Sequence, residues 1–459
     1  MDFDALLLSR LQFAFTIGFH IIFPAFSIGL ASFLAVLEGL WLFTKKPLFK
    51  NLYLFWVKIF ALSFAMGVVS GVVMSYEFGT NWSAFARLAG SVIGPLLGYE
   101  VLTAFFLEAS FLGIMLFGWK RVGPGLHFAS TVIVAAGTLT SAFWIISANS
   151  WMQTPQGFAF AADGTMVATD FFKVIFNPSM PSRLAHMVLS AYLTTAMVVG
   201  GASAFALLAG RPKAESGTSL RMAILMMAVV GPMQIMAGHE SGIVAHAHQP
   251  AKVAALEGWW TTRPSQPTVL IGFPNEQAQR NDLALEVSGL GSAVNNLPAD
   301  ETVRGLDSFA AQDRPPVFIT FWAFRVMVGM GLVMVALGLW GAALWAAKRV
   351  DTAKWFQRAA MLAAPSGFVA VVCGWIVAEV GRQPFLVYGV LRTADGVAPV
   401  QAGQVGFSLL MFIVTYAIVF TAGAIYILRL INKGPDSHEP EPKQNEPPGS
   451  TLGAAVREA

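Results

Sequence analysis

Residues 374–385 read Gly-Trp-Ile-Val-Ala-Glu-Val-Gly-Arg-Gln-Pro-Phe and end a long apolar run. They place the carboxylate of Glu379 three residues before the guanidinium of Arg382. A carboxylate inside a bilayer costs about 2.5–3.5 kcal/mol on insertion scales, so such a residue usually marks a functional site. An ion pair at the lipid interface with no further role explains the two residue types equally well.

The rest of the chain has the composition of a membrane protein with many spans. Of its 459 residues, 56% are hydrophobic and 12% are charged. Apolar stretches of at least ~18 residues recur, and each is long enough for a helix to cross a bilayer core of ~30 Å. We therefore expect an all-α integral membrane protein with about nine transmembrane helices. The predicted spans are 11–43, 53–76, 92–117, 126–150, 183–209, 222–241, 317–347, 359–380 and 407–430.

Lysine and arginine gather in alternate connections between these spans. They are Lys45, Lys46 and Lys50; Lys120 and Arg121; Arg211, Lys213 and Arg221; Lys348, Arg349, Lys354 and Arg358; and Arg429 and Lys433. Because basic connections stay in the cytoplasm, an odd number of spans places the N-terminus outside and the C-terminus in the cytoplasm. The formal net charge of +3 then reflects topology and gives no reason to expect a nucleic-acid partner.

Two regions lack the pattern of a membrane helix. Residues 245–316 form a long connection on the outside with Pro, Gly and mixed charge, and loops of this length are usually functional or disordered. We expect residues 434–459 to be a disordered cytoplasmic tail, since they carry no apolar period. The single cysteine, Cys373, lies inside a span and is expected to be a small apolar residue.

Four side chains that can bind heme iron recur at one depth of the predicted bundle. They are His20 in the first span, His186 at the start of the fifth, Met327 in the seventh and Glu379 near the end of the eighth. With the topology above, all four belong to the outer half of the bilayer. A His/Met pair is a known axial ligation of heme. A hydrogen bond between helices explains a single membrane histidine as well, and a buried Met most often only packs.

Several motifs, in order along the chain, resemble those of subunit I of the cytochrome bd quinol oxidases. They are Ser-Arg-Leu-Gln-Phe-Ala-Phe (9–15), Phe-Gly-Thr-Asn-Trp-Ser (78–83), Phe-Phe-Leu-Glu (105–108), Ala-Asn-Ser-Trp-Met-Gln (148–153), Gln-Pro-Ala-Lys (249–252), Phe-Arg-Val-Met (324–327) and the opening stretch. The compact outside loop and Gly-Arg-Gln-Pro-Phe-Leu-Val-Tyr-Gly-Val-Leu-Arg-Thr (381–393) resemble the short-loop, cyanide-insensitive branch. One departure is His239, which stands where relatives commonly carry Asp before Glu-Ser-Gly.

The resemblance implies three hemes. His186 and Met327 match the pair that binds the low-spin heme b, while His20 and Glu379 match the axial ligands of two high-spin hemes, b and d. We expect Glu379 at the high-spin heme b and His20 at heme d, or at a heme b in its place. The two high-spin positions appear interchanged within the family, so the opposite assignment stays open.

Arg325 and Arg382 each lie close to one of these ligands in the sequence. Beside a heme they would pair with propionates or stabilise charged neighbours, because the guanidinium fork suits carboxylates. Snorkelling of the two side chains to the lipid interface is the alternative.

Glu100 and Glu108 lie eight residues apart in the third span. On a straight α-helix this spacing gives a net turn of about 80° and a rise of about 12 Å, so both carboxylates share one broad face. Stacked acids along a transmembrane face suggest a proton relay, and the matching acids of the family serve proton delivery and the heme environment. Structural pairing with a propionate or a neighbouring helix is the alternative.

In the outside loop, Lys252 and Glu257 match residues linked to quinol binding and oxidation in the family. A quinol must lose protons as well as electrons, and a carboxylate can accept one. The five-residue spacing turns a helix by about 140°, so the two side chains could flank a ligand. Without the resemblance, a charge pair on a loop is usually only solvated surface.

We therefore predict a heme-bearing transmembrane domain over residues 1–433, including a periplasmic quinol-binding loop at 245–316, in a bacterial inner membrane. The expected activity is quinol oxidation at the outer face and reduction of dioxygen to water, which charges the membrane without a pumping stroke. Expected partners are quinol, dioxygen, the lipid bilayer and a membrane subunit II in a heterodimer, with room for a small accessory subunit. The alternatives are a membrane heme protein that relays electrons without reducing dioxygen, and a transporter with a buried Glu/Arg site.

Overall fold

The computed structural model describes residues 4–298 and 300–436. Within them, nine helical segments are long and apolar enough to cross a membrane, which confirms the expected number of spans. The first segment comprises α1 (Ala5–His20) and α2 (Ile22–Thr44), which meet at Ile21. Asp4 caps α1, since its carboxylate accepts a hydrogen bond from the backbone N–H of Leu7 at 2.7 Å.

The other spans are built from longer helices and two composite segments. They are α3 (Pro47–Gly79); α4 (Ser83–Glu100), a π-helical turn η1 (Val101–Phe105) and α5 (Phe106–Phe117); α6 (Pro124–Gln153); α8 (Met180–Leu208); α9 (Lys213–His248); α12 (Val317–Ala346); α13 (Lys354–Leu362) with α14 (Ser366–Val380); and α16 (Ala402–Lys433).

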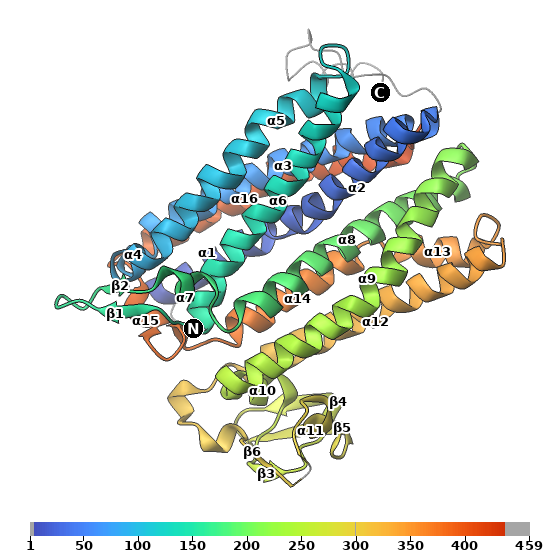
Figure 1. The fold of residues 1–459 in the computed structure, drawn as a ribbon. Coiled ribbons are helices and arrows are strands. Elements are labelled where there is room, and N and C mark those ends of the chain that lie inside the picture. The colour runs from blue at the N-terminus through green and yellow to red at the C-terminus, as the bar shows by residue number, and fades with distance from the viewer. Residues whose placement is uncertain (1–3, 299, 437–459) are drawn as a thin grey trace.

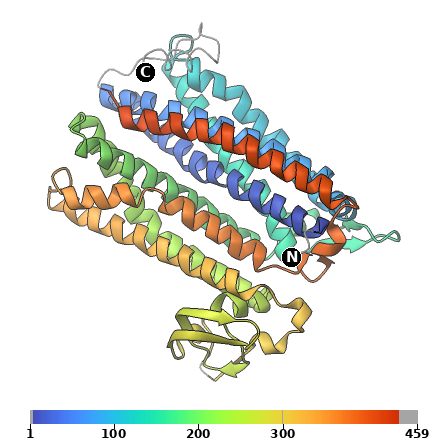
Figure 2. The same cartoon turned by 180° about the vertical axis from the view of Figure 1, so that it is seen from behind.

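The helices form two groups that run side by side (Figure 1). One contains α1–α6, with α16 lying along α1 and α3 (Figure 2), and the other contains α8, α9 and α12–α14. Helices α2 and α8 join the groups, and the Thr195 hydroxyl donates to the carbonyl of Phe26 at 2.9 Å. Large apolar side chains from both groups, such as Leu34, Phe60 and Phe356, share one buried core.

The described residues are mostly helical, as expected, and short strands occur in the connections between the spans. Before α8 lie β1 (Phe158–Phe160), β2 (Met166–Ala168) and α7 (Phe171–Ile175); after α14 lie β7 (Phe385–Val387), β8 (Leu391–Arg392) and α15 (Thr393–Gly396).

The long connection after α9 is a folded unit at the end of the molecule where the N-terminus lies (Figure 1). Its elements are α10 (Pro250–Glu257), β3 (Arg263–Pro264), β4 (Thr268–Asn275), β5 (Arg280–Val287), α11 (Leu290–Val294), β6 (Thr302–Val303), η2 (Leu306–Ser308) and η3 (Ala311–Asp313). Strands β4 and β5 form an antiparallel hairpin, and β3 pairs with β6. Of the predicted tail, residues 437–459 lie outside the described residues.

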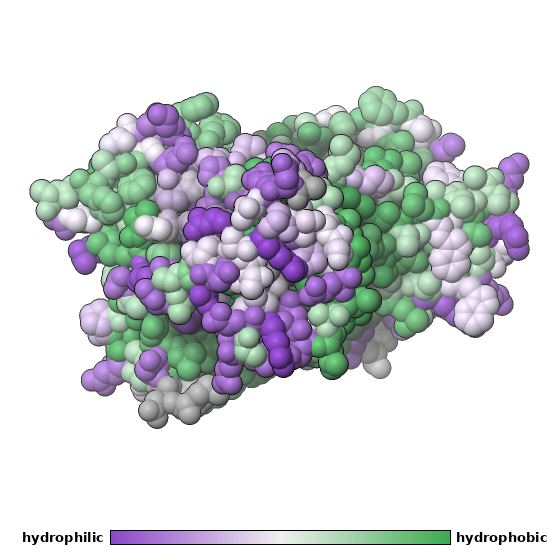
Figure 3. Space-filling model, turned by 90° about the horizontal axis from the view of Figure 1, so that it is seen from below, coloured by the Kyte–Doolittle hydropathy of each residue, from purple (hydrophilic) through white to green (hydrophobic). Residues whose placement is uncertain are grey.

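Seen from this end, the space-filling surface has hydrophilic residues gathered at the front and hydrophobic residues along the flanks (Figure 3). The flanks carry exposed apolar side chains of several spans, among them Leu332, Leu339, Phe407 and Ile418. An apolar flank with polar ends is the surface that a bilayer requires of a helical bundle.

Candidate functional site: a buried polar network between the loop and the outer helix ends

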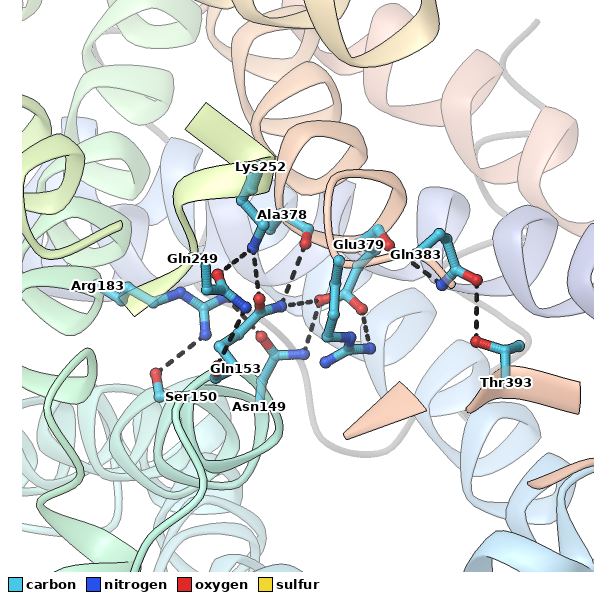
Figure 4. Close-up of polar contacts among 11 residues, drawn as sticks. Asn149, Ser150, Gln153, Arg183, Gln249, Lys252, Ala378, Glu379, Gln383 and Thr393 are labelled. Atoms are coloured by element: carbon cyan, nitrogen blue, oxygen red, sulfur yellow. Dashed lines mark hydrogen bonds and ion pairs between the residues drawn. The ribbon is translucent and has the colours of Figure 1, made fainter. Parts of the chain in front are cut away.

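Glu379, in the last turn of α14, anchors a network of buried polar side chains (Figure 4). Its carboxylate pairs with the guanidinium of Arg382 in the turn after the helix. Asn149 on α6 donates to the same carboxylate at 3.0 Å. The ion pair inferred from the sequence therefore exists, and it lies inside the protein because the Arg382 side chain is only 4% exposed.

The network continues from Glu379 to the loop through Gln153 in the last turn of α6 (Figure 4). The Gln153 amide donates to the carbonyl of Ala378 at 3.2 Å and to Glu379 at 3.4 Å. The ammonium of Lys252 donates to the side-chain oxygens of Gln153 and Gln249. Lys252 and Glu379 are thus bridged by one side chain, which brings together two residues 127 positions apart in the sequence.

Lys252 and Glu257 are buried at opposite ends of α10, so they do not lie on a solvated loop surface. Burial, with the nearby cations Arg183 and Arg382, lowers the pKa of Lys252 well below its ordinary value. Burial raises the pKa of Glu257, although the guanidinium of Arg325 opposes that shift. Both shifts favour the neutral forms of the two side chains, and perturbed pKa values of this kind gather at functional sites.

Arg325, on α12, holds the loop against the bundle. Its Nε donates to the carbonyl of Val269 at 3.0 Å, and its Nη1 donates to the carbonyl of Leu256. Its Nη2 lies 3.6 Å from the carboxylate of Glu257. The structure therefore places this guanidinium on loop carbonyls and on Glu257, and its pairing with a heme propionate stays a prediction.

The surroundings of His20 fit an axial heme ligand. Its Nδ1 lies 2.9 Å from the hydroxyl of Ser70 on α3, and that hydroxyl donates to the carbonyl of Met66. An Nδ1–H that donates to Ser70 leaves the lone pair of Nε2 for a metal ion. This arrangement of ligand and supporting hydrogen bond is common around protein-bound metals.

His186 and Met327 both lie in the second helix group, and each packs against a glycine. His186 Cε1 would lie 3.1 Å from a Cβ placed on Gly238 of α9, and Met327 Sδ would lie 3.1 Å from one on Gly374 of α14. His186 Nδ1 is buried without a hydrogen-bond partner, and Nε2 has a weak contact of 3.4 Å with the amide nitrogen of Gln234. An imidazole with few protein partners at a close helix contact fits a metal ligand.

Two arginines beside Glu379 are suited to carboxylates that the chain itself does not supply. Nε and Nη1 of Arg382 are buried and have no hydrogen-bond partner. Arg183 on α8 donates to Asn149 at 2.5 Å and to Ser150 at 3.0 Å, both neutral groups. Buried guanidinium groups usually pair with anions, so this region fits a heme that brings its own propionates.

Glu100 and Glu108 both face α6, but the segment that carries them is not one straight α-helix. The π-helical turn η1 separates them, so the rotation and rise calculated for a straight helix do not apply. The Ser141 hydroxyl of α6 donates to Glu100 at 2.8 Å, and a Cβ on Gly137 would lie 2.7 Å from Glu108 Cγ. Ser141 and Gly137 are four residues apart on α6, so both acids meet one stripe of that helix.

A buried acid–imidazole pair lies at the opposite end of the first helix group, and the sequence analysis did not single it out. Glu38 on α2 accepts from His127 on α6, with 2.6 Å between Oε1 and Nδ1. The Thr131 hydroxyl donates to the other carboxylate oxygen at 2.5 Å. Both ionisable side chains are at most 1% exposed. The signal that could have found the pair is an acid in an apolar run, as for Glu379.

Comparison with known proteins identifies the family. The family model of "Cytochrome bd terminal oxidase subunit I" matches residues 8–435. This chain belongs to that family.

Individual relatives are similar to this chain over nearly its whole length. "Cytochrome bd ubiquinol oxidase subunit 1" of Bacillus subtilis (strain 168) is 35% identical, over 96% of this chain and 97% of the relative. "Cytochrome bd-II ubiquinol oxidase subunit 1" of Escherichia coli (strain K12) is 29% identical, over 95% and 98%. The bd oxidase structure from Geobacillus thermodenitrificans matches with a TM-score of 0.87 and 30% identity, over 94% of this chain and 99% of that chain. The family resemblance seen in the motifs is therefore confirmed.

Proposed function

We propose that this chain is the heme-bearing subunit of a quinol oxidase, which oxidises quinol at the outer membrane face and reduces dioxygen to water. The observation that carries the proposal is the buried path from Lys252 through Gln153 to Glu379. It connects α10 of the loop, the proposed quinol site, to the helix end that carries a proposed heme ligand. A transporter has no need of a loop helix tied to such a ligand.

We assign these residues to three hemes. His186 and Met327 would hold the low-spin heme b, Glu379 the high-spin heme b, and His20 heme d or a heme b in its place. When bound, the hemes supply one-electron carriers and the iron that binds dioxygen. Arg382, with its unpaired buried nitrogens, would pair with a propionate.

In the proposed quinol site, Lys252 orients one quinol oxygen and Glu257 accepts a proton from the other. The raised pKa of Glu257 suits a group that takes up a proton and then releases it. Arg325 keeps Glu257 in place by donating to the backbone carbonyls of Leu256 and of Glu257 itself. Released quinol protons leave on the outside.

Protons for dioxygen reduction come from the cytoplasm past Glu108 and Glu100, which face the Ser141 side of α6. This direction follows from the basic connections, which place the N-terminus outside and the C-terminus in the bacterial cytoplasm. Separation of charge then contributes about 2.3 kcal/mol per charge per 100 mV without a pumping stroke. A membrane subunit II completes the complex, with room for a small accessory subunit.

The proposal predicts two properties of the purified complex. Pyridine hemochrome analysis should detect heme b, and quinol should drive oxygen uptake. Heme without quinol-dependent oxygen uptake would support an electron relay instead, and the absence of heme would support a transporter.

We expect Glu257→Gln to lower quinol-driven oxygen uptake by about 100-fold, because general bases contribute about 10²–10⁴-fold. The hemes should remain bound, since Glu257 lies outside the spans. Oxygen uptake with an artificial electron donor that bypasses quinol should stay at the level of the unchanged protein. Glu286→Gln, in an exposed carboxylate of the same loop, is the matched control and should behave normally. Equal loss with both donors would show that Glu257 is structural.

The pH dependence of quinol oxidation should report the raised pKa of Glu257. A base must be ionised, so kcat/KM for quinol should rise with pH through an acid limb that lies above the ordinary glutamate range. Glu257→Gln should abolish this limb, whereas Glu286→Gln should retain it. An acid limb that persists in Glu257→Gln would assign the titration to another group.

A further inference from the structure

The β4–β5 hairpin of the loop turns an apolar face outward. Ile271 lies directly opposite Leu285 in the register, and Val287 follows Leu285 two residues later on β5. The register shifts between Ile271 and Phe273, and Leu283 lies at this irregularity. Ile271 is 52% exposed, Leu283 is 86% exposed, Leu285 is 58% exposed and Val287 is 40% exposed. A two-stranded sheet on a solvated loop normally points its apolar residues inward and its polar residues outward. The hairpin reverses that pattern.

The hairpin is closely packed at Gly272. A Cβ on Gly272 would lie 3.1 Å from Val269 and 3.4 Å from Ala284, so no room remains there for a larger side chain. The exposed apolar side chains are therefore not half of a core that closes within the loop. They need a partner outside the loop.

Leu283 is held in a backbone conformation that leucine disfavours. Its φ is 50°, in the left-handed region, and it is the most exposed large apolar side chain of the hairpin. Glycine or asparagine would adopt this conformation at lower cost. In water, both the strained backbone and the exposed apolar side chain of this leucine are unfavourable. This combination indicates that the side chain has a function at this place.

The hairpin is fixed to the outer end of α12. The carboxylate of Glu276, in its turn, accepts from the backbone N–H groups of Val317 and Phe318 at 2.8 Å and 3.3 Å, so it caps the first turn of the helix. Phe273 of β4 packs against Trp322, with 5.7 Å between ring centroids. The hairpin therefore lies at a set height relative to a span.

The neighbouring surface of α12 is apolar as well. Phe318 and Ile319 in its first turn are 49% and 51% exposed, and exposed apolar side chains continue along the helix at Leu332 and Leu339. This is the surface that the bilayer covers in a transmembrane helix. The hairpin adjoins this surface, since its turn residue Glu276 accepts from the backbone N–H of the exposed Phe318.

We propose that the outward face of the β4–β5 hairpin, comprising Ile271, Leu283, Leu285 and Val287, lies in the outer leaflet of the bilayer. Acyl chains near the headgroups cover the apolar side chains, as they do for interfacial amphipathic segments. The Arg280 side chain, which is 70% exposed near the turn and pairs with Asp282 at 2.7 Å, then lies at the level of the headgroup phosphates. This part of the inference rests on the proposed function. The anchor holds α10 at the depth where a membrane quinol diffuses.

Fluorescence quenching tests the anchor without any need for oxidase activity. Leu283→Cys is labelled with an environment-sensitive fluorophore in a Cys373→Ala background, and the whole complex is reconstituted in phosphatidylcholine vesicles. We expect quenching by lipids that carry a shallow doxyl group and protection from aqueous iodide. The matched control is Ala310→Cys, at an exposed position elsewhere in the loop, which iodide should quench. Quenching of position 283 by iodide alone would overturn the proposal. Protection from both quenchers would also overturn it, because it would show that a protein partner covers this face in place of lipid.

Leu283→Gly tests the link to substrate supply. Glycine accepts the positive φ, so the fold should be retained while the apolar side chain is lost. We expect KM for a long-chain quinol in vesicles to rise by about tenfold, the effect of losing one buried apolar side chain, with kcat unchanged. KM for a short-chain, water-soluble quinol should not change. An unchanged KM for both quinols would refute the supply role, while loss of all activity with lipid quenching intact would point to the proposed function instead.

Discussion

Replacing His186 by alanine should remove the low-spin heme b and stop quinol-driven turnover. The imidazole lies against α9 at Gly238, and its Nδ1 is buried without a hydrogen-bond partner among the described residues. Met327→Leu keeps the shape and packing against Gly374 but removes the sulfur, so it should have the same effect. We expect turnover to fall by more than about 100-fold in each variant.

Reduced-minus-oxidised spectra of the purified complex measure this prediction. His246→Ala removes a histidine near the C-terminal end of α9, and Met330→Leu removes a thioether one turn further along α12. Both controls should keep the low-spin band and turnover. A complete low-spin spectrum in His186→Ala and Met327→Leu would move the ligands elsewhere, whereas loss of every heme would indicate failed assembly.

The number and order of the spans could be predicted from the sequence because the bilayer imposes one rule on every segment. A helix must be apolar over about 20 residues, and 359–380 or 407–430 satisfy that rule without help from their neighbours. The prediction that His20 and His186 share one depth rests on the same rule. Glu379 and Arg382 also pair across a single helical turn, so their contact is local in sequence.

Contacts between distant segments could not be predicted. Lys252 and Gln153 are 99 residues apart and meet only because α10 folds back over the C-terminal end of α6. Glu38 and His127 are 89 residues apart, and neither has a sequence neighbour that indicates the other. The π-helical turn between Glu100 and Glu108 is set by packing on α6 and leaves no periodic signal. Burial of Glu257 likewise depends on the fold of the whole loop.

Glu108→Gln should slow dioxygen reduction by about 100-fold or more while quinol still reduces the low-spin heme. Glutamine keeps the shape of the side chain and removes its titratable proton. The carboxylate is buried in α5, 6% exposed, and it approaches α6 where Gly137 leaves room for it. Among the residues that the structure describes, no cation forms an ion pair with Glu108. A buried carboxylate without such a partner is costly in a membrane, so a structural role alone does not explain it.

Heme content and turnover must be measured on the same Glu108→Gln preparation, because the two roles predict different pairs of results. A proton carrier gives normal heme with slow turnover, and a structural residue gives missing high-spin heme or failed assembly. Glu215→Gln changes another buried carboxylate, at the start of α9 and away from the Ser141 stripe, and should leave both quantities unchanged. Normal heme with normal turnover would end the relay hypothesis. Slow turnover with normal heme in Glu108→Gln, and in Glu100→Gln as well, would place both acids on one proton route along α6, as their shared contact with that helix requires.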